Sequence, residues 1–229
     1  MSSQPLISVV VPIHKQASKL QTIRKTVLTS ATPTELIVVV NNPQLKNIPR
    51  HPHERVIICQ HKGRGYSLIK GIQRAEGNII VLLHSDTTLP LEWDIAIIET
   101  LHNSGVVGGG FSMSYDSPSY FLKTLIKLSN IRFHLTGVMF GDRAIFARSE
   151  ILKNCLQALC VPLFEDVRLS KCLRKYGTTR LLKEKVITSA EAFRKNSMSG
   201  HLWRVIKSQL WYALGGDVNR IYEYYYSKK

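Results

Sequence analysis

Nearly continuous apolar runs mark the N-terminal half of the chain. The runs at Ile7–Ile13, Glu35–Val40 and Ile79–Leu83 are rich in Val and Ile and lack the polar alternation of a half-exposed strand. A shorter run of the same kind lies at Val56–Cys59. Strands that are covered on both faces have this pattern, and they occur mainly in parallel sheets. These segments therefore predict a largely parallel sheet.

Amphipathic segments fill the intervals between these runs. Apolar residues recur at every third or fourth position over Lys15–Ser30 and again over Tyr66–Ala75, as they do along one face of a helix. Strands that alternate with such helices build β-α-β units. The predicted fold class is therefore α/β, with a Rossmann-like, mixed or mostly parallel sheet flanked by helices.

The pattern is less regular beyond residue 105. We expect strands at Phe111–Tyr115, Asp142–Arg148 and Arg180–Thr188, and helices at Tyr120–Phe133, Val167–Tyr176 and His201–Leu214. An aromatic tail, Tyr222–Tyr226, follows. A chain of 229 residues is long enough for one sizeable core and short for two. A single domain over residues 1–229 is expected, in which residues 201–229 form a C-terminal helix and tail.

The charge of the chain is strongly positive, at +15 in formal terms at pH 7. Such an excess favours anionic partners, namely nucleotide diphosphates, acidic lipid surfaces or nucleic acid, but solvation of the surface explains it equally well. Nucleic acid is the weakest of these candidates, because no RNP, zinc-finger or helix-turn-helix signature accompanies the charge.

The sequence lacks the signals of a membrane or secreted protein and the cysteine spacing of a metal or redox site. No apolar stretch approaches the roughly 18 residues of a membrane span, and the N-terminus has no basic region followed by an apolar one, as a secretory signal would. A cytoplasmic location is therefore expected. Cys59, Cys155, Cys160 and Cys172 show no Cys-x-x-Cys spacing. In a reducing compartment we interpret them as buried structural thiols rather than as metal or redox groups.

The first candidate for chemistry is Asp86, in the segment Leu83–Thr87 that directly follows a predicted strand. Ligands of open α/β sheets bind at the carboxyl ends of the strands. A carboxylate there, flanked by an imidazole and hydroxyls, can hold Mg²⁺ or Mn²⁺ while diphosphate oxygens complete the coordination shell. A turn or a helix cap is an equally good interpretation of a single Asp at a strand end.

The second candidate is the pair Glu165 and Asp166, at the start of a predicted basic helix. A carboxylate aimed at an acceptor hydroxyl removes its proton as a general base. Negative charge also stabilises a helix N-terminus, so the pair has a structural interpretation as well, and both interpretations can hold together.

Other enzyme classes lack their signatures. The glycine-rich segments Gly63–Gly65 and Gly108–Gly110 form neither a Gly-x-Gly-x-x-Gly fingerprint nor a P-loop. The sequence also contains no Gly-x-Ser-x-Gly, no His-Glu-x-x-His and no zinc-type Cys/His spacing. Kinase, dinucleotide-binding, hydrolase and zinc-enzyme interpretations are therefore disfavoured.

An ordered set of blocks resembles the family 2 glycosyltransferases of the GT-A fold, and more narrowly the small bacterial members of that family. The resemblance covers roughly residues 6–190. The matching blocks, in chain order, are Ile7–Pro12, Glu35–Val40, Gly63–Ile80, Leu83–Thr87 where the family has its Asp-x-Asp motif, Val107–Phe111, Gly141–Phe146 and Phe164–Val167.

The resemblance implies a hexosyltransferase-type enzyme that moves a sugar from a UDP- or GDP-sugar to an acceptor hydroxyl with inversion. It implies Mn²⁺ or Mg²⁺ bound by Asp86 and His84, and Asp166 or Glu165 as the catalytic base. Residues from about 6 to 115 would bind the nucleotide sugar, and those from about 116 to 200 the acceptor. The donor-binding residues that it implies are Pro12, His14, Asn41, Asn42, Gly63, Arg64, Ser85, Asp86, Gly141 and Asp142.

Three sites depart from the family pattern. Asn41 and Asn42 stand where an Asp usually binds the nucleotide base, although an amide can still pair with a base edge. His84 takes the first position of Asp-x-Asp, which leaves Asp86 as the metal carboxylate and predicts weak metal affinity. His14 begins the segment that replaces the usual Asn-Glu after the first strand. A second hypothesis therefore remains, a glycosyltransferase-like protein that binds a nucleotide or polyanion with little or no turnover.

Two segments, Tyr120–Phe133 and His201–Leu214, combine apolar and aromatic residues with Lys and Arg. Helices that lie on an acidic lipid surface have this composition. A helix packed on the core with a solvated basic face has it too, and for the first segment we favour that interpretation. If both segments contact lipid, the protein is peripheral at the inner face of the membrane, and the acceptor is a lipid-linked sugar or a polyprenyl phosphate.

Overall fold

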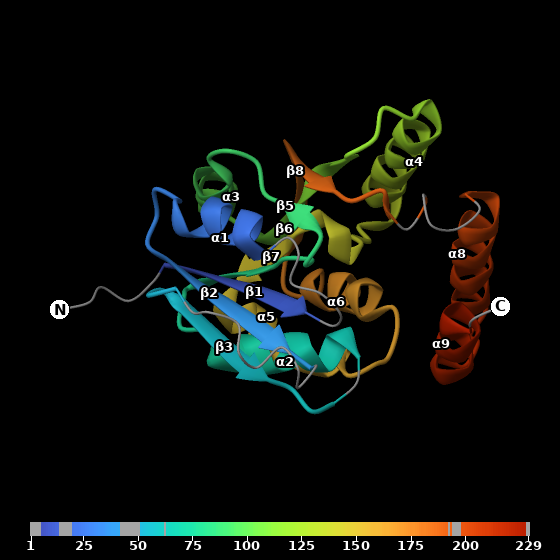
Figure 1. Ribbon diagram of the computed structural model, residues 1–229, viewed down its shortest axis with the longest axis horizontal. Coiled ribbons are helices and arrows are strands. Elements are labelled where there is room, and N and C mark those ends of the chain that lie inside the picture. Colours follow the sequence, from blue (N-terminus) through green and yellow to red (C-terminus); the bar gives the residue numbers. More distant parts are fainter. Residues whose placement is uncertain are drawn as a thin grey trace.

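The computed structural model describes residues 6–13, 20–41, 51–61, 63–191, 193 and 198–227 (Figure 1). Two of the expected donor-binding residues, His14 and Asn42, lie outside this part of the chain. The helix expected from Lys15 is described only from Leu20 onward.

The described elements alternate between strands and helices in the N-terminal half. The strands are β1 (Ile7–Ile13), β2 (Thr34–Val40), β3 (Glu54–Ile58), β4 (Ile79–Leu82), β5 (Thr87–Thr88), β6 (Val106–Tyr115), β7 (Ile145–Arg148) and β8 (Thr178–Thr188). The helices are α1 (Leu20–Leu28), α2 (Arg64–Arg74), α3 (Trp93–His102), α4 (Tyr120–Thr136), α5 (Ser149–Asn154), α6 (Glu165–Leu173), α8 (Met198–Ala213) and α9 (Val218–Tyr226), with short 3-10 helices η2 (Gly141–Arg143) and η3 (Leu156–Leu159).

The strands form one mixed sheet in the order β3-β2-β1-β4-β7-β6-β8-β5. The pairs β3–β2, β2–β1, β1–β4 and β6–β8 are parallel. The pairs β4–β7, β7–β6 and β8–β5 are antiparallel. The prediction of a mixed, mostly parallel sheet is therefore confirmed. Because β1 to β4 run in the same direction, their carboxyl ends meet at one edge of the sheet.

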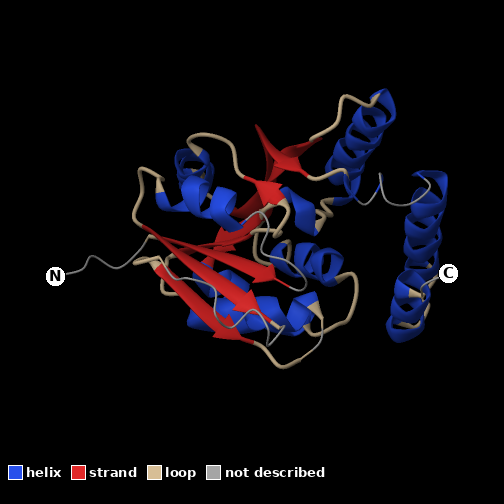
Figure 2. Cartoon of the chain, viewed as in Figure 1, coloured by secondary structure: helices blue, strands red, loops and turns tan. Residues whose placement is uncertain are grey.

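Helices cover both faces of this sheet (Figure 2). Side chains alternate between the two faces along a strand. Val9 and Val11 of β1 belong to the apolar cluster that includes residues of α1 and α3, whereas Val10 belongs to the cluster that includes residues of α2, α5 and α6. All three valines are fully buried. The absence of polar alternation in these runs thus reflects two-sided burial, as predicted.

The fold differs from the sequence prediction in several places. The segment expected to be one strand over Asp142–Arg148 begins instead with the 3-10 turn η2, and Ala144 takes a left-handed backbone conformation with φ 48° before β7 starts. Helix α3 was not predicted because Trp93–His102 is apolar on most sides and lacks a clear polar face. The aromatic tail is helix α9, whose N-cap residue Asp217 accepts a hydrogen bond from the Arg220 backbone N–H at 2.9 Å.

The cysteine interpretation was wrong in part. Cys155, at the end of α5, forms a disulfide with Cys172 of α6, across a Cα–Cα distance of 5.9 Å. Cys160 is exposed, and only Cys59 is the buried thiol that we expected. Sequence spacing could not reveal the pairing, because the packing of α6 against η3, which begins directly after Cys155, brings the two cysteines together.

No helix among the described residues combines the length and the hydropathy that crossing a lipid bilayer requires.

Candidate functional site

His84, Ser85 and Asp86 follow β4 at the edge where the parallel strands end. The His84 Nδ1 atom lies 2.5 Å from Asp86 Oδ1, and the Thr87 hydroxyl donates to the same oxygen at 3.3 Å. The His84 and Asp86 side chains are 37% and 40% exposed, so a ligand can reach both. Ser85 is half-buried between them. The predicted metal-binding residues thus form one accessible pair.

The carboxyl group of Asp86 favours its charged form. Partial burial opposes ionisation, but the hydrogen bonds and the charge interaction with His84, together with the Thr87 hydroxyl, outweigh it and hold the pKa of Asp86 below its ordinary value. Asp86 is therefore anionic at neutral pH and suited to a hard divalent cation. Among the described residues, no group of three or more His, Cys, Asp or Glu side chains gathers as around a closed metal centre.

Asp142, in the turn η2, lies close enough to interact electrostatically with Asp86, His84 and Arg64. Burial raises the pKa of Asp142, partly offset by neighbouring cations, and its buried Oδ1 atom has no hydrogen-bond partner among the described residues. The Thr188 hydroxyl links the two acids: it lies 3.0 Å from the Thr87 hydroxyl and donates to the Asp142 carbonyl at 3.4 Å. The β5–β8 pairing therefore brings the Asp86 turn and η2 together.

The second candidate pair, Glu165 and Asp166, meets the same turn from the other side. Arg64, at the start of α2, donates to Glu165 Oε1 at 2.9 Å and to the Gly141 carbonyl at 3.2 Å. The Gly141 N–H in turn donates to Asp166 Oδ2 at 2.8 Å. Four residues that the sequence analysis selected from distant blocks therefore form one network.

The network leaves no room for a side chain at Gly141. A Cβ atom at this position would lie 2.0 Å from the Arg64 Nη1 atom, so the guanidinium could not stay beside the turn. Gly63 precedes α2 with a φ of 115°, a backbone conformation that residues with side chains rarely adopt. Both glycines thus serve to position Arg64.

The two acids at the start of α6 differ in their surroundings. Glu165 is buried and ion-paired with Arg64. Asp166 accepts backbone hydrogen bonds from Gly141 and from Val167, the latter at 2.7 Å. Burial and the neighbouring charge of Glu165 raise the pKa of Asp166 to about 7, against the opposing effect of Arg64 and the backbone hydrogen bonds. A carboxyl group that titrates near neutral pH is suited to act as a general base, and Asp166 is the better candidate of the two.

Two further expected donor contacts lie at the same edge of the sheet. Pro12 is buried near the end of β1, beside Val39 in the parallel register. Asn41 directly follows β2, is half-buried, and donates its backbone N–H to the Ile13 carbonyl at 3.4 Å. Their positions agree with a ligand at the carboxyl edge, but no described contact joins them to the Asp86 network.

The chain matches the model of a known family. The match covers residues 8–154, and the family is described as "Glycosyl transferase family 2". This protein is a member of glycosyl transferase family 2. The matched segment contains Asp86 and Asp142 but ends before Glu165 and Asp166, so the geometry above is what links these two acids to the site.

Solved structures of glycosyltransferases share the fold. The mannosyltransferase PcManGT from Pyrobaculum calidifontis, in complex with GDP-Man and Mn²⁺, superimposes with a TM-score of 0.61 over 91% of this chain and 62% of its own, at 17% identity. S. aureus TarS 1-349 gives a TM-score of 0.58 over 80% of this chain and 60% of its own, at 16% identity. No curated protein matches the sequence. The similarity confirms the GT-A fold, and the chain spans about three fifths of each of these structures.

The family 2 match also leaves out the C-terminal helices, which sequence reasoning did not connect with the site. Phe164, directly before the two acids, is a buried residue with a left-handed φ of 62°. Its ring lies 4.5 Å, centroid to centroid, from the ring of Tyr212 in α8. In α9, Tyr225 interacts electrostatically with Asp166, and burial raises the pKa of Tyr225. The helical pair α8–α9 therefore packs beside the start of α6.

We predict that Tyr212→Ala lowers the turnover of this glycosyltransferase about tenfold. An aromatic pair contributes roughly 0.5–1.5 kcal/mol, and its loss frees Phe164 from a strained backbone conformation that sets the direction of Glu165 and Asp166. Tyr212→Phe, which keeps the ring, is the matched control and retains near wild-type turnover. Steady-state kinetics measure both; equal turnover in Tyr212→Ala and wild type would contradict the positioning role.

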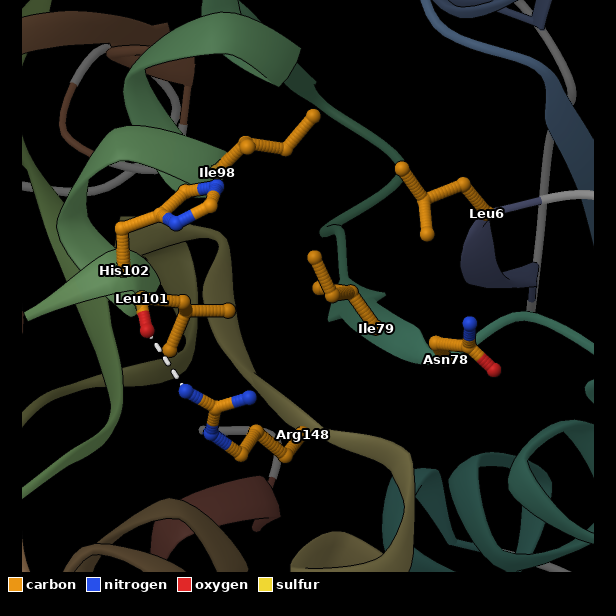
Figure 3. Close-up of a pocket in the computed structure, with 7 residues that line it drawn as sticks. All are labelled: Leu6, Asn78, Ile79, Ile98, Leu101, His102 and Arg148. Atoms are coloured by element: carbon orange, nitrogen blue, oxygen red, sulfur yellow. Dashed lines mark hydrogen bonds between the residues drawn. The ribbon is translucent and has the colours of Figure 1, made fainter. Parts of the chain in front are cut away.

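A separate cavity of about 350 Å³ lies at the opposite edge of the sheet (Figure 3). It is bounded by residues at the N-terminal ends of β1 and β4 and by residues of α3 and β7, namely Leu6, Asn78, Ile79, Ile98, Leu101, His102 and Arg148. On one wall of the cavity Arg148 donates to the Leu101 carbonyl (Figure 3). Because the acids lie at the carboxyl ends of the strands, this cavity is not part of the candidate site.

Proposed function

We propose that this family 2 glycosyltransferase moves a hexose from a UDP- or GDP-sugar to an acceptor hydroxyl, with inversion at the anomeric carbon. The observation that carries the proposal is the turn Gly141–Asp142. Asp142 interacts with His84 and Asp86 on one side, and Gly141 binds Asp166 on the other. A candidate donor-phosphate site and a candidate base thus adjoin across one short turn.

A divalent metal fits the residues at the Asp86 turn. Asp86 supplies a carboxylate and His84 an imidazole. Asp142 adds a buried carboxylate oxygen that has no hydrogen-bond partner in the described part of the chain. Mg²⁺ and Mn²⁺ commonly take one or two protein ligands and complete their shell with substrate phosphates and water. Asp86 and His84 would hold the ion, which when bound would neutralise the charge of the leaving diphosphate. The Mn²⁺ in the PcManGT complex supports this assignment.

The donor is held, in this proposal, by residues at the carboxyl edge. Asn41 follows β2 where it can pair with the nucleotide base, and Pro12 shapes the end of β1. Arg64, fixed by Glu165 and the Gly141 carbonyl, adds positive charge beside the same turn. The GDP-Man in the PcManGT complex supports a nucleoside diphosphate sugar as the class of donor.

Asp166 is proposed as the catalytic base. Its pKa of about 7 leaves a substantial deprotonated fraction at neutral pH and makes the carboxylate a stronger proton acceptor than an ordinary Asp. In an inverting displacement, one base removes the proton of the acceptor hydroxyl while its oxygen attacks the anomeric carbon and the nucleoside diphosphate departs. Glu165 forms an ion pair with Arg64 and holds that cation in place.

We predict that nucleoside diphosphates stabilise the protein only when Mn²⁺ is present. The protein supplies only two candidate metal ligands, and the diphosphate supplies others. The metal ion and the diphosphate should therefore bind to the protein together far more tightly than either binds alone. A ligand at about a hundred times its Kd adds about 2.7 kcal/mol to the free energy of unfolding. Thermal unfolding with UDP, GDP and ADP, each with Mn²⁺ or with EDTA, measures this. The same stabilisation in EDTA would contradict the metal assignment.

The alternative of a binding protein with little turnover is motivated by Asn41 and His84, which stand where acids are usual. It predicts the same Mn²⁺-dependent stabilisation, followed by no sugar release from any donor. Binding and turnover must therefore be measured on the same preparation.

A further inference from the structure

Helix α4 leaves a stripe of large apolar side chains exposed. Leu128 is 57% exposed, Ile131 55% and Leu135 80%, and their spacing of three and four residues places them on one side of the helix. Phe121, one helical repeat earlier, is 38% exposed. The opposite side packs on the protein through the buried Leu122 and Phe133. The core-packing interpretation therefore accounts for only one side of α4.

Helix α8 has a second stripe of the same kind. Trp203 is 65% exposed, Ile206 38% and Leu210 58%, and Leu214 directly after the helix is 87% exposed. Figure 1 shows α4 and α8 on the same side of the molecule, the side toward which the arrowheads of β1 and β2 point. Both helices therefore lie beyond the carboxyl edge that carries the candidate site.

The charged side chains within these two helices have one sign. Neither α4 nor α8 contains an acidic residue. Exposed Lys123 and Lys127 flank the stripe of α4, and exposed Lys207 lies within that of α8. Amphipathic helices that lie in the headgroup region of an anionic bilayer combine exposed Leu and Trp with flanking cations in this way.

We propose that the exposed stripes of α4 and α8 form a docking face for an anionic lipid bilayer. A second copy of the chain would also cover the apolar residues. A symmetric pair, however, would bring the lysines of one copy toward those of the other, with no acid in either helix to compensate. Charge complementarity therefore selects anionic lipid headgroups. Docking itself is independent of catalysis, whereas the corollary that the acceptor is lipid-linked rests on the proposed function.

Sedimentation with lipid vesicles, in the absence of donor, tests this face. We expect the full chain to sediment with vesicles of phosphatidylcholine and phosphatidylglycerol, and not with vesicles of phosphatidylcholine alone. Leu128→Gln and Leu135→Gln should each weaken binding about tenfold, and Lys123→Gln and Lys127→Gln about fivefold each. Leu91→Gln is the matched control, because Leu91 is 92% exposed but lies outside both helices, and it should bind as wild type.

Several results would overturn the proposal: no sedimentation with anionic vesicles, equal binding to both lipids, or equal losses in the Leu91 and Leu128 variants. A dimer in analytical ultracentrifugation that Leu128→Gln dissociates would assign the face to a second copy instead. Circular dichroism of each variant checks folding. Asp166→Asn should bind vesicles as wild type does, so failure of the docking face and failure of the proposed catalysis are separable.

Discussion

Asp166→Asn is expected to reduce sugar transfer by about 10²–10⁴-fold while leaving donor affinity within a factor of two or so. The amide keeps the size of the side chain, although its single oxygen can accept only one of the two backbone hydrogen bonds that Gly141 and Val167 donate to the carboxylate. It cannot remove the proton of the acceptor hydroxyl. Turnover is measured as nucleoside diphosphate release in the presence of acceptor, and donor affinity by calorimetry.

Glu165→Gln is the informative comparison, because it changes the adjacent acid in the same conservative way. Glu165 holds Arg64 through an ion pair rather than facing the acceptor proton, so its loss should cost less turnover than that of Asp166. If Glu165→Gln is the more damaging of the two, Glu165 is the base and the assignment of roles is reversed.

The pH dependence of kcat/KM gives a second measurement of the role of Asp166. With the pKa of Asp166 at about 7, kcat/KM should rise with pH and level off above that value, and Asp166→Asn should lose this acidic limb. The groups whose charges act on Asp166 are Glu165, which raises its pKa, and Arg64, which lowers it, together with Arg132 of α4 and Tyr225 of α9.

Stability should follow the same titration with a defined sign. The pKa of Asp166 is raised in the folded protein above its ordinary 3.8, so the folded state binds the proton more tightly than the unfolded state does. The tighter binding of this proton by the folded state adds to the free energy of unfolding below pH 4 or so, and the added stability is lost as the pH rises toward 7. Chemical denaturation at several pH values should show a smaller decline over this range in Asp166→Asn. An unchanged decline would show that Asp166 is not the group responsible.

Asp86→Asn is expected to lower transfer by about two to three orders of magnitude and to remove the enhancement of nucleotide binding by Mn²⁺. The substitution removes the negative charge, and with it the one carboxylate of the accessible His84–Asp86 pair. His84→Gln should have a smaller effect, since the carboxylate remains. Calorimetry of GDP and UDP with and without Mn²⁺ separates the two variants. Full activity with an intact Mn²⁺ effect in Asp86→Asn would exclude a metal at this turn.

Local sequence patterns were sufficient to predict much of the sheet. The runs that became β1, β2 and β4 are buried on both faces, so every position along them is apolar or specifically paired, and no competing pattern obscures them. Asp86 was identifiable because strand ends in such sheets carry ligands. Glu165 and Asp166 were identifiable as acids at a helix start. Each of these signals lies within a few residues of sequence.

Contacts between distant segments could not be predicted in this way. The ion pair between Arg64 and Glu165 joins residues 101 positions apart. The conformation of η2, which brings Gly141 to Asp166, depends on tertiary hydrogen bonds rather than on the propensity of its own residues. The stacking of Tyr212 on Phe164 likewise requires α8 to fold back onto α6. The proposed division of roles between Glu165 and Asp166 therefore rests on contacts that local sequence patterns do not reveal.

Release of nucleoside diphosphate from a panel of UDP-, GDP- and other nucleotide sugars, with Mn²⁺ and then with EDTA, tests the central claim most directly. We expect that at least one donor is cleaved or transferred, that EDTA stops the reaction, and that Asp86→Asn and Asp166→Asn each slow it by about a hundredfold or more. Tight Mn²⁺-dependent nucleotide binding without release from any donor, in the presence of sugar and lipid-linked acceptors, would contradict the central claim and identify the protein as a nucleotide-binding relative of the glycosyltransferases.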